Sequence, residues 1–444
     1  MCIRDSGTLH PGGTISVSGN IVASSGAVLD VSGSSATFDV HPTSLGDVGA
    51  PNVPSNSGLN SPLWRLSTVP LRLDSNGGSI DLQGSQMLLS DATLVGHAGG
   101  PTAVGGMLSI FSGRFYPDGA GRTSADINLV VKQSGPTLAA TNTNPRIGVA
   151  VLDAAGASLA GMGYFAVDRF VQGEFASLDL GYKFIDGNPL SFGGNVQFAG
   201  PVSITAKGNL RVAGGGVIQA DSAVNLTAKY IAVGQSFRAP LNPNDTFLPF
   251  TQSPANPGLA YNFAPTFGAG SLTVTADLID IGTLSLQSIG RATFKASNGD
   301  IRGNGTLQIA GDLTLQAAQI YPTTLGSFNV FAYNHGGLPG AVTIIGDGSR
   351  AAPLSAGGSL NFFASQITQR GVLRAPLGSI TLGWDGTDFD PTTAALDAPV
   401  NPIAGAGIGT PLAQQVTLSS GSLTSVAAWS GTAGTEMLIP FGLS

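Results

Sequence analysis

The chain has 444 residues and is poor in charge: only 10% of its residues are charged, against roughly 25% in an ordinary globular protein, and the net charge is −7. No cluster of Lys and Arg can neutralise a phosphate backbone, so we expect no nucleic-acid partner. The single cysteine, Cys2, excludes an internal disulfide, and the 42% of hydrophobic residues excludes a disordered chain. Glycine occurs 64 times, and such a balance favours short strands joined by tight turns over helices.

Residues 1–6 (MCIRDS) do not resemble the sequence that follows, and they lack the apolar segment of a secretory signal peptide. We interpret them as a non-native scar and expect the remainder to be an internal or C-terminal piece of a longer protein. No run of 18 apolar residues is present, so the sequence predicts no transmembrane helix.

Residues 7–192 are predicted to form strand-rich coils, interrupted by a Pro/Ser/Asn-rich loop at 39–74 and by a short helix near 168–180. Residues 193–400 hold the most regular coils, with a Pro-rich excursion at 236–269. Because proline cannot serve a central strand, we expect this excursion to pack on the surface of the coils. Residues 401–444 are predicted to form a linker and a C-terminal coil.

Between the loops, hydrophobic residues recur with a period of about twenty residues. Two positions keep nearly the same step through three successive units: Val274, Phe294 and Leu313 at the first, and Ile281, Ile301 and Ile320 at the second. Val202 likewise recurs as Val224, and Leu360 as Ile380. Within each unit, apolar and polar residues alternate, which places one face of a strand inward and the other outward. The pattern predicts an all-β fold, a right-handed parallel β-helix (β-solenoid) with coils of about twenty residues.

Several phrases occur in order in the second half of the chain: YIAVGQ at 230–235, GSLTV at 270–274, GDLTL at 311–315, AAQIYP at 317–322, GSLTS at 421–425 and LIPFG at 438–442. In these phrases the chain resembles the filamentous haemagglutinin-like large exoproteins of bacterial two-partner secretion. The resemblance covers most of residues 193–442 and, more loosely, the N-terminal third. It departs from the family in lacking the Asn-Pro-Asn-Gly phrase of the secretion domain: Asn242 begins Asn-Pro-Asn-Asp, which stands in a different context and lacks the Gly.

The resemblance implies a secreted protein at the bacterial cell surface, associated with the outer membrane and built on a long β-helix. It implies export by an outer-membrane two-partner secretion transporter and a role in adhesion or biofilm formation, with a host or surface glycan or protein as ligand. Some members of the family carry a C-terminal toxin. The stem of a contact-dependent growth-inhibition toxin is therefore an alternative function.

Asp280 and Asp300 are the first candidate site. They precede Ile281 and Ile301, so a twenty-residue coil is expected to stack them one rung apart, at about 5 Å. Retaining glycosidases hold two carboxyls at about this separation, so a polysaccharide-active β-helix enzyme is a second alternative. A bound cation is another interpretation of the pair. Against both, Asp commonly begins a turn and bonds its own backbone.

Asp385, Asp388 and Asp390, in the segment WDGTDFD, are the second candidate site. Oxygen ligands at this spacing can hold Ca²⁺, although the segment matches no known calcium loop motif. A solvated loop before Pro391 is the alternative interpretation. The neighbouring Trp384 either stacks on a sugar or packs under its own turn.

We therefore expect a structural segment of a surface adhesin, a rigid rod without catalytic residues or cofactors. Its binding residues are expected in the loops at 39–74 and 236–269, because loops can vary while the coils must keep their geometry.

Overall fold

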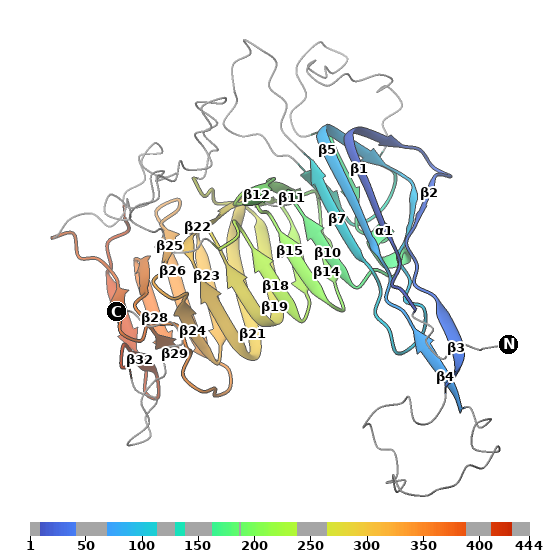
Figure 1. The fold of residues 1–444 in the computed structure, drawn as a ribbon. Helices are drawn as coiled ribbons and strands as arrows, with labels where there is room; N and C mark the ends of the chain where they lie inside the picture. The colour runs from blue at the N-terminus through green and yellow to red at the C-terminus, as the bar shows by residue number, and fades with distance from the viewer. Residues whose placement is uncertain are drawn as a thin grey trace, which may run out of the picture.

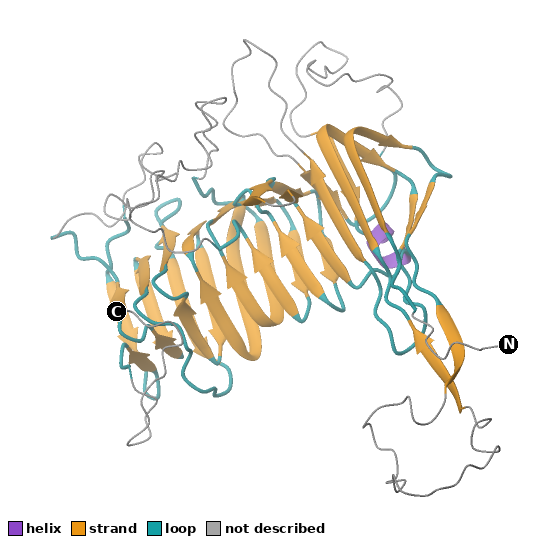
Figure 2. Ribbon diagram, viewed as in Figure 1, coloured by secondary structure: helices purple, strands orange, loops and turns teal. Residues whose placement is uncertain are grey.

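A computed structural model of the chain describes residues 9–40, 69–112, 129–137, 162–185, 188–237, 264–387 and 410–428. These residues are almost entirely β-structure: 26 strands belong to one long parallel sheet, and the other strands form three two-stranded sheets. Figure 1 shows the strands of the long sheet following one another from the N-terminal (blue) to the C-terminal (red) end. The helix α1 (Asp168–Gln172) lies in the N-terminal part of the molecule (Figure 2).

The long sheet consists of three series of parallel pairings, which we call stack 1, stack 2 and stack 3. Two strands, β1 (Thr14–Ala23) and β5 (Ser79–Ser90), pass from stack 3 into stack 1. Two others, β19 (Gly270–Ile281) and β21 (Ile289–Gly303), pass from stack 2 into stack 3. The chain therefore visits the stacks in the order 1, 2, 3 and then returns to stack 1.

Stack 1 begins with the second halves of β1 and β5. From β5 the pairing continues in the order β9, β8, β13, β16, β20, β22, β25, β27 and β30. Chain order is broken once, because β9 lies between β5 and β8. The bounds are β8 (Leu129–Lys132), β9 (Met162–Ala166), β13 (Val196–Phe198), β16 (Val217–Ala220), β20 (Leu284–Gln287), β22 (Gly305–Ala310), β25 (Ser327–Tyr333), β27 (Ser359–Ala364) and β30 (Ser379–Leu382).

Stack 2 pairs six strands with the first halves of β19 and β21. They are β14 (Val202–Thr205), β17 (Ala223–Thr227), β23 (Asp312–Ala317), β26 (Ala341–Gly346), β28 (Gln366–Arg370) and β31 (Gln415–Leu418). Five consecutive rungs carry an outward threonine in register, each partly exposed: Thr273, Thr293, Thr314, Thr343 and Thr368. This face is polar and solvated.

Stack 3 pairs seven strands with β1, β5 and the second halves of β19 and β21. They are β7 (Met107–Ser112), β10 (Ser177–Leu180), β15 (Asn209–Val212), β18 (Tyr230–Val233), β24 (Gln319–Pro322), β29 (Val372–Arg374) and β32 (Leu423–Ser425). Its inward side is a column of stacked aliphatic residues, all buried: Ile80, Leu108, Leu178, Leu210, Ile231, Ile279, Ile301, Ile320 and Leu373.

The inward residues of the three stacks form one continuous hydrophobic core. Stack 1 also buries its outer side: Phe331 and Phe363 face each other across adjacent strands with ring centroids 5.0 Å apart, and Tyr333 and Trp384 pack against them. Trp384 therefore packs on a second, smaller aromatic cluster formed by β25 and β27.

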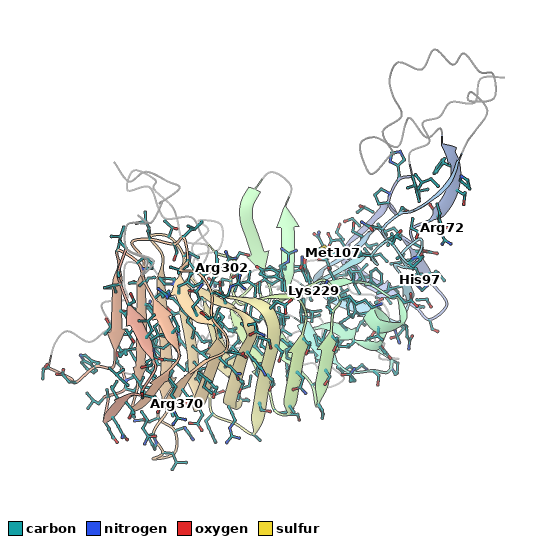
Figure 3. The ribbon with its side chains drawn as sticks, turned by 90° about the horizontal axis from the view of Figure 1, so that it is seen from below. Arg72, His97, Met107, Lys229, Arg302 and Arg370 are labelled. Atoms are coloured by element: carbon teal, nitrogen blue, oxygen red, sulfur yellow. The ribbon has the colours of Figure 1, made fainter. Side chains whose placement is uncertain are left out.

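Three two-stranded sheets stand beside the long sheet. A parallel pair is formed by β2 (Val28–Asp30) and β6 (Thr93–Val95). Antiparallel hairpins are formed by β3 (Ser35–Val40) with β4 (Val69–Asp74), and by β11 (Tyr182–Ile185) with β12 (Asn188–Gly193). In Figure 3 the β11–β12 hairpin stands out from the body as two pale green arrows.

The predicted loops are partly described. Residues 41–68 of the loop at 39–74 and 238–263 of the excursion at 236–269 lie outside the described residues, as do residues 1–6. The described end of the excursion runs beside β20, where Gln287 Nε2 donates to the carbonyl of Ala264 (3.2 Å) and the Ser288 N–H to Thr266 Oγ1 (2.7 Å).

The helix predicted near 168–180 is correct only in its first part. α1 ends at Gln172, Gly173 is its C-cap, and Glu174 has a positive φ of 54°. Residues 177–180 form β10, because Leu178 and Leu180 turn into the core between β7 and β15. Burial of two leucines in the sheet outweighs the weak helical preference of this short segment.

The predicted register is right at four pairs and wrong at two. Val274 faces Phe294, Ile301 faces Ile320, Val202 faces Val224 and Leu360 faces Ile380, as predicted. Phe294, however, faces Leu315 rather than Leu313, and Ile281 faces Gly303 rather than Ile301.

Both register errors come from one corner of β21. Between stacks 2 and 3, this strand takes seven steps from Phe294 to Ile301, whereas β19 takes five from Val274 to Ile279. The longer corner contains Asn298, which has a positive φ of 50°, and Gly299. A repeat of constant length cannot predict a corner that holds two additional residues.

The inward position of Ile301 gives a direct test of the core. Ile301→Asp should destabilise the protein by several kcal/mol, because it buries an unpaired charge, whereas Thr293→Asp on the solvated face should cost less than about 1 kcal/mol. Chemical denaturation of the two variants measures the difference. Equal losses would contradict the assigned inward and outward faces.

The corrected register can be tested by cross-linking in a Cys2→Ser background. Thr293→Cys with Thr314→Cys should form a disulfide, because the two residues face each other on strands about 4.8 Å apart. Thr293→Cys with Asp312→Cys should not, because two further residues along the strand take the Cα atoms beyond about 7 Å. Mass spectrometry under non-reducing conditions detects the disulfide in each variant. If Phe294 faced Leu313, as the sequence predicted, only the second pair would form one.

Candidate functional site

The predicted metal loop is only partly described, because Asp388 and Asp390 lie outside the described residues. Asp385 is exposed, and its Oδ1 accepts hydrogen bonds from the Thr387 hydroxyl (2.7 Å) and N–H (3.0 Å), which hold the pKa of the carboxyl below its usual value. Asp385 thus caps its own turn. The described residues contain no group of three or more His, Cys, Asp or Glu that could hold a metal ion, and the calcium site stays a prediction.

The predicted stacking of Asp280 on Asp300 is wrong. Asp280 faces Arg302 across the rung, and Asp300 faces Leu278, because the long corner of β21 shifts the register by two residues. The pairing replaces a carboxyl–carboxyl contact with an ion pair. The geometry expected for a retaining glycosidase therefore does not arise from direct stacking of these two residues.

Asp280 is held by three hydrogen bonds. Arg302 donates from Nε to Oδ1 (2.8 Å) and from Nη2 to Oδ2 (2.7 Å), and the Tyr230 hydroxyl donates to Oδ2 (2.8 Å). The bonds to Asp280 raise the pKa of Arg302, while burial and the Asp280 charge raise that of Tyr230. Arg302 therefore stays charged and Tyr230 stays a protonated donor at neutral pH. Two-point contact fixes the plane of the guanidinium.

The same arrangement occurs three rungs earlier in stack 3. Asp179 of β10 faces Arg211 of β15, which binds it through Nε (2.7 Å) and Nη2, and the Arg211 guanidinium lies 5.4 Å from the centre of the Tyr182 ring. Asp179 is buried, and burial raises the pKa of its carboxyl although Arg211 opposes the shift. Both pairs occupy the outward column of stack 3, where Arg211, Ala232, Asp280, Arg302 and Tyr321 follow rung by rung.

Asp300 is less completely paired. Its Oδ2 accepts hydrogen bonds from the Tyr321 hydroxyl (3.2 Å) and from Gln319 Nε2 (3.4 Å). Its Oδ1 lies 3.4 Å from Arg350 Nε but accepts no hydrogen bond from the described residues. We call the group Tyr230, Asp280, Asp300, Arg302, Gln319, Tyr321 and Arg350 the stack 3 polar cluster. Figure 3 places Arg302 on the side of the body from which the β11–β12 hairpin projects, and Arg370 on the opposite side.

The sequence identified the two aspartates of this cluster as candidates but not its arginines and tyrosines. Arg302 follows Asp280 by one coil, so the pairing is visible in the sequence only once the corner of β21 is known to hold two additional residues. Arg350 comes from the connection between β26 and β27, whose position no periodicity predicts.

Comparison of the chain with known protein families, curated proteins and solved structures finds no match. Relationship to the filamentous haemagglutinin-like exoproteins therefore stays a prediction from the sequence. Within the described part of the chain, no helix has the length and apolar character needed to span a membrane.

A double-mutant cycle on Asp280→Ala and Arg302→Ala measures the coupling within the cluster. Because Asp280 is 6% exposed and bonded at two points, we expect a coupling free energy of about 1–2 kcal/mol from thermal or chemical denaturation. The control is Arg291 with Asp312, which face each other on the solvated side of stack 2 and should couple by less than about 0.5 kcal/mol. Equal couplings would show that the stack 3 pair contributes no more than a surface contact.

Proposed function

We propose that the chain is a structural segment of a secreted bacterial surface adhesin, in which a right-handed β-solenoid with coils of about twenty residues forms a rigid stalk. The proposal rests on the architecture of the described residues. In it, 26 strands form one parallel sheet around a continuous core, and two hairpins project from this sheet. Such an arrangement is a scaffold that presents projecting segments.

The distribution of charge supports this proposal. Asp179 and Asp280, two buried acids of stack 3, are bonded at two points to arginines of adjacent rungs, so they join rungs together. The outward threonines of stack 2 make a solvated, weakly charged face. The resemblance noted in the sequence adds export by an outer-membrane transporter and a cell-surface location to the proposal, with a host or surface glycan or protein as ligand.

Attachment can be tested with the purified segment coupled to fluorescent beads. We expect the beads to be retained on epithelial monolayers or on polymer surfaces several-fold better than beads that carry an unrelated β-rich protein. Retention no greater than that of the control on any surface would contradict the adhesive function.

Replacing the loop of the β3–β4 hairpin tests whether that loop contains the binding residues. Val40 and Val69 face each other at its end, so residues 41–68 can be replaced by Asn-Gly, which closes a two-residue hairpin turn. If this loop carries the binding residues, the variant should lose retention while its far-UV circular dichroism and melting temperature stay unchanged. Full retention would assign attachment to another part of the segment.

A further inference from the structure

Two buried acceptors in the stack 3 polar cluster have no hydrogen-bond donor among the described residues. They are Oδ1 of Asp300 and Oε1 of Gln319, whose residues are 7% and 2% exposed. Gln319 faces Asp300 across the rung, and its Nε2 is already engaged by Asp300 (3.4 Å) and by the carbonyl of Ala351 (3.0 Å). Buried acceptors are normally satisfied, so this pair indicates a group that supplies two donors.

The groups around these acceptors decide what the missing partner is. Arg302 engages Asp280 with Nε and Nη2, and its Nη1 donates no hydrogen bond to the described residues. The charges of Asp280 and Asp300 are balanced by those of Arg302 and Arg350. A cation would therefore meet two guanidinium groups with no net negative charge to hold it, and a neutral partner is favoured.

A neutral ligand at this place must donate to the two acceptors and accept from Arg302. Vicinal hydroxyl groups of a sugar do both, because each hydroxyl is a donor and an acceptor. Two partly exposed tyrosines add phenol groups to the cluster: Tyr321 faces Arg302 across the rung, and Tyr230 donates to Asp280. Strands of the stack repeat at about 4.8 Å, which is close to the length of one pyranose unit in an extended chain.

Arg350 lies at the surface beside Asp300 and is held loosely. Its side chain is 49% exposed, and its two contacts, to Asp300 Oδ1 and to the carbonyl of Asn298, are both 3.4 Å long. A shift of this exposed side chain costs two weak contacts and opens room at Asp300 Oδ1, while the two groups stay close enough to balance each other's charge. The site therefore has a route of entry that leaves the strands of stack 3 in place.

We propose that the stack 3 polar cluster binds a neutral glycan, with ligand hydroxyls donating to Asp300 Oδ1 and Gln319 Oε1 and accepting from Arg302. The inference deepens the proposed attachment function, and it places a binding site on the face of the stalk rather than in its loops. It can fail while bead retention succeeds, because the two measurements use different ligands.

The test is binding of the purified segment to an array of neutral hexose and N-acetylhexosamine oligosaccharides, followed by calorimetry with the best neutral hexasaccharide. Galacturonic acid hexamers serve as the anionic comparator. Gln319→Met and Asp300→Asn should each weaken binding about tenfold or more, because each removes one acceptor. Melting temperatures confirm that both variants are folded.

The matched control is Gln308→Met. Gln308 is 1% exposed and also has an unpartnered Oε1, but it lies on stack 1, so its loss should leave glycan affinity unchanged. Binding to no neutral glycan would overturn the proposal and assign the two acceptors to ordered water. Preference for the anionic comparator, or equal effects of Gln319→Met and Gln308→Met, would also overturn it.

Discussion

The parallel ladder between successive rungs is the constraint on which the rest of the structure depends. Each strand of a stack must satisfy its backbone groups on the strands before and after it, and its inward side chains must fill the space that their neighbours leave. The aliphatic column of stack 3, from Ile80 to Leu373, shows the result: nine residues from distant parts of the sequence lie one above another. Without disulfides, this burial and the ladder carry the stability of the molecule.

The same constraint governs where polar groups can lie. A residue that points outward on one rung lies beside outward residues of the two adjacent rungs, so a buried charge needs its partner on a neighbouring strand. Asp179 and Asp280 meet this requirement with Arg211 and Arg302. On stack 1 part of the outward side is instead apolar, because Phe331, Tyr333 and Phe363 pack together in the second cluster.

A scaffold of this kind separates architecture from recognition. The solvated threonines of stack 2 can change without disturbing the core, and the β3–β4 and β11–β12 hairpins add segments beside the long sheet. The stack 3 polar cluster differs from both, because it combines fully paired groups such as Asp280 with incompletely paired ones such as Asp300. Incomplete pairing beside a rigid ion pair is the basis of the ligand site that we propose.

Alternation and recurrence in the sequence determined the β-rich character of the protein, the inward direction of Val274 and Ile301, and four of the register pairs, because these follow from the two-residue period of a strand. Only the tertiary structure decided that Asp280 faces Arg302 and that β9 lies between β5 and β8. Corner length sets the first of these outcomes. It depends on single residues such as Asn298 in a left-handed conformation, and a single residue leaves no periodic signal in the sequence.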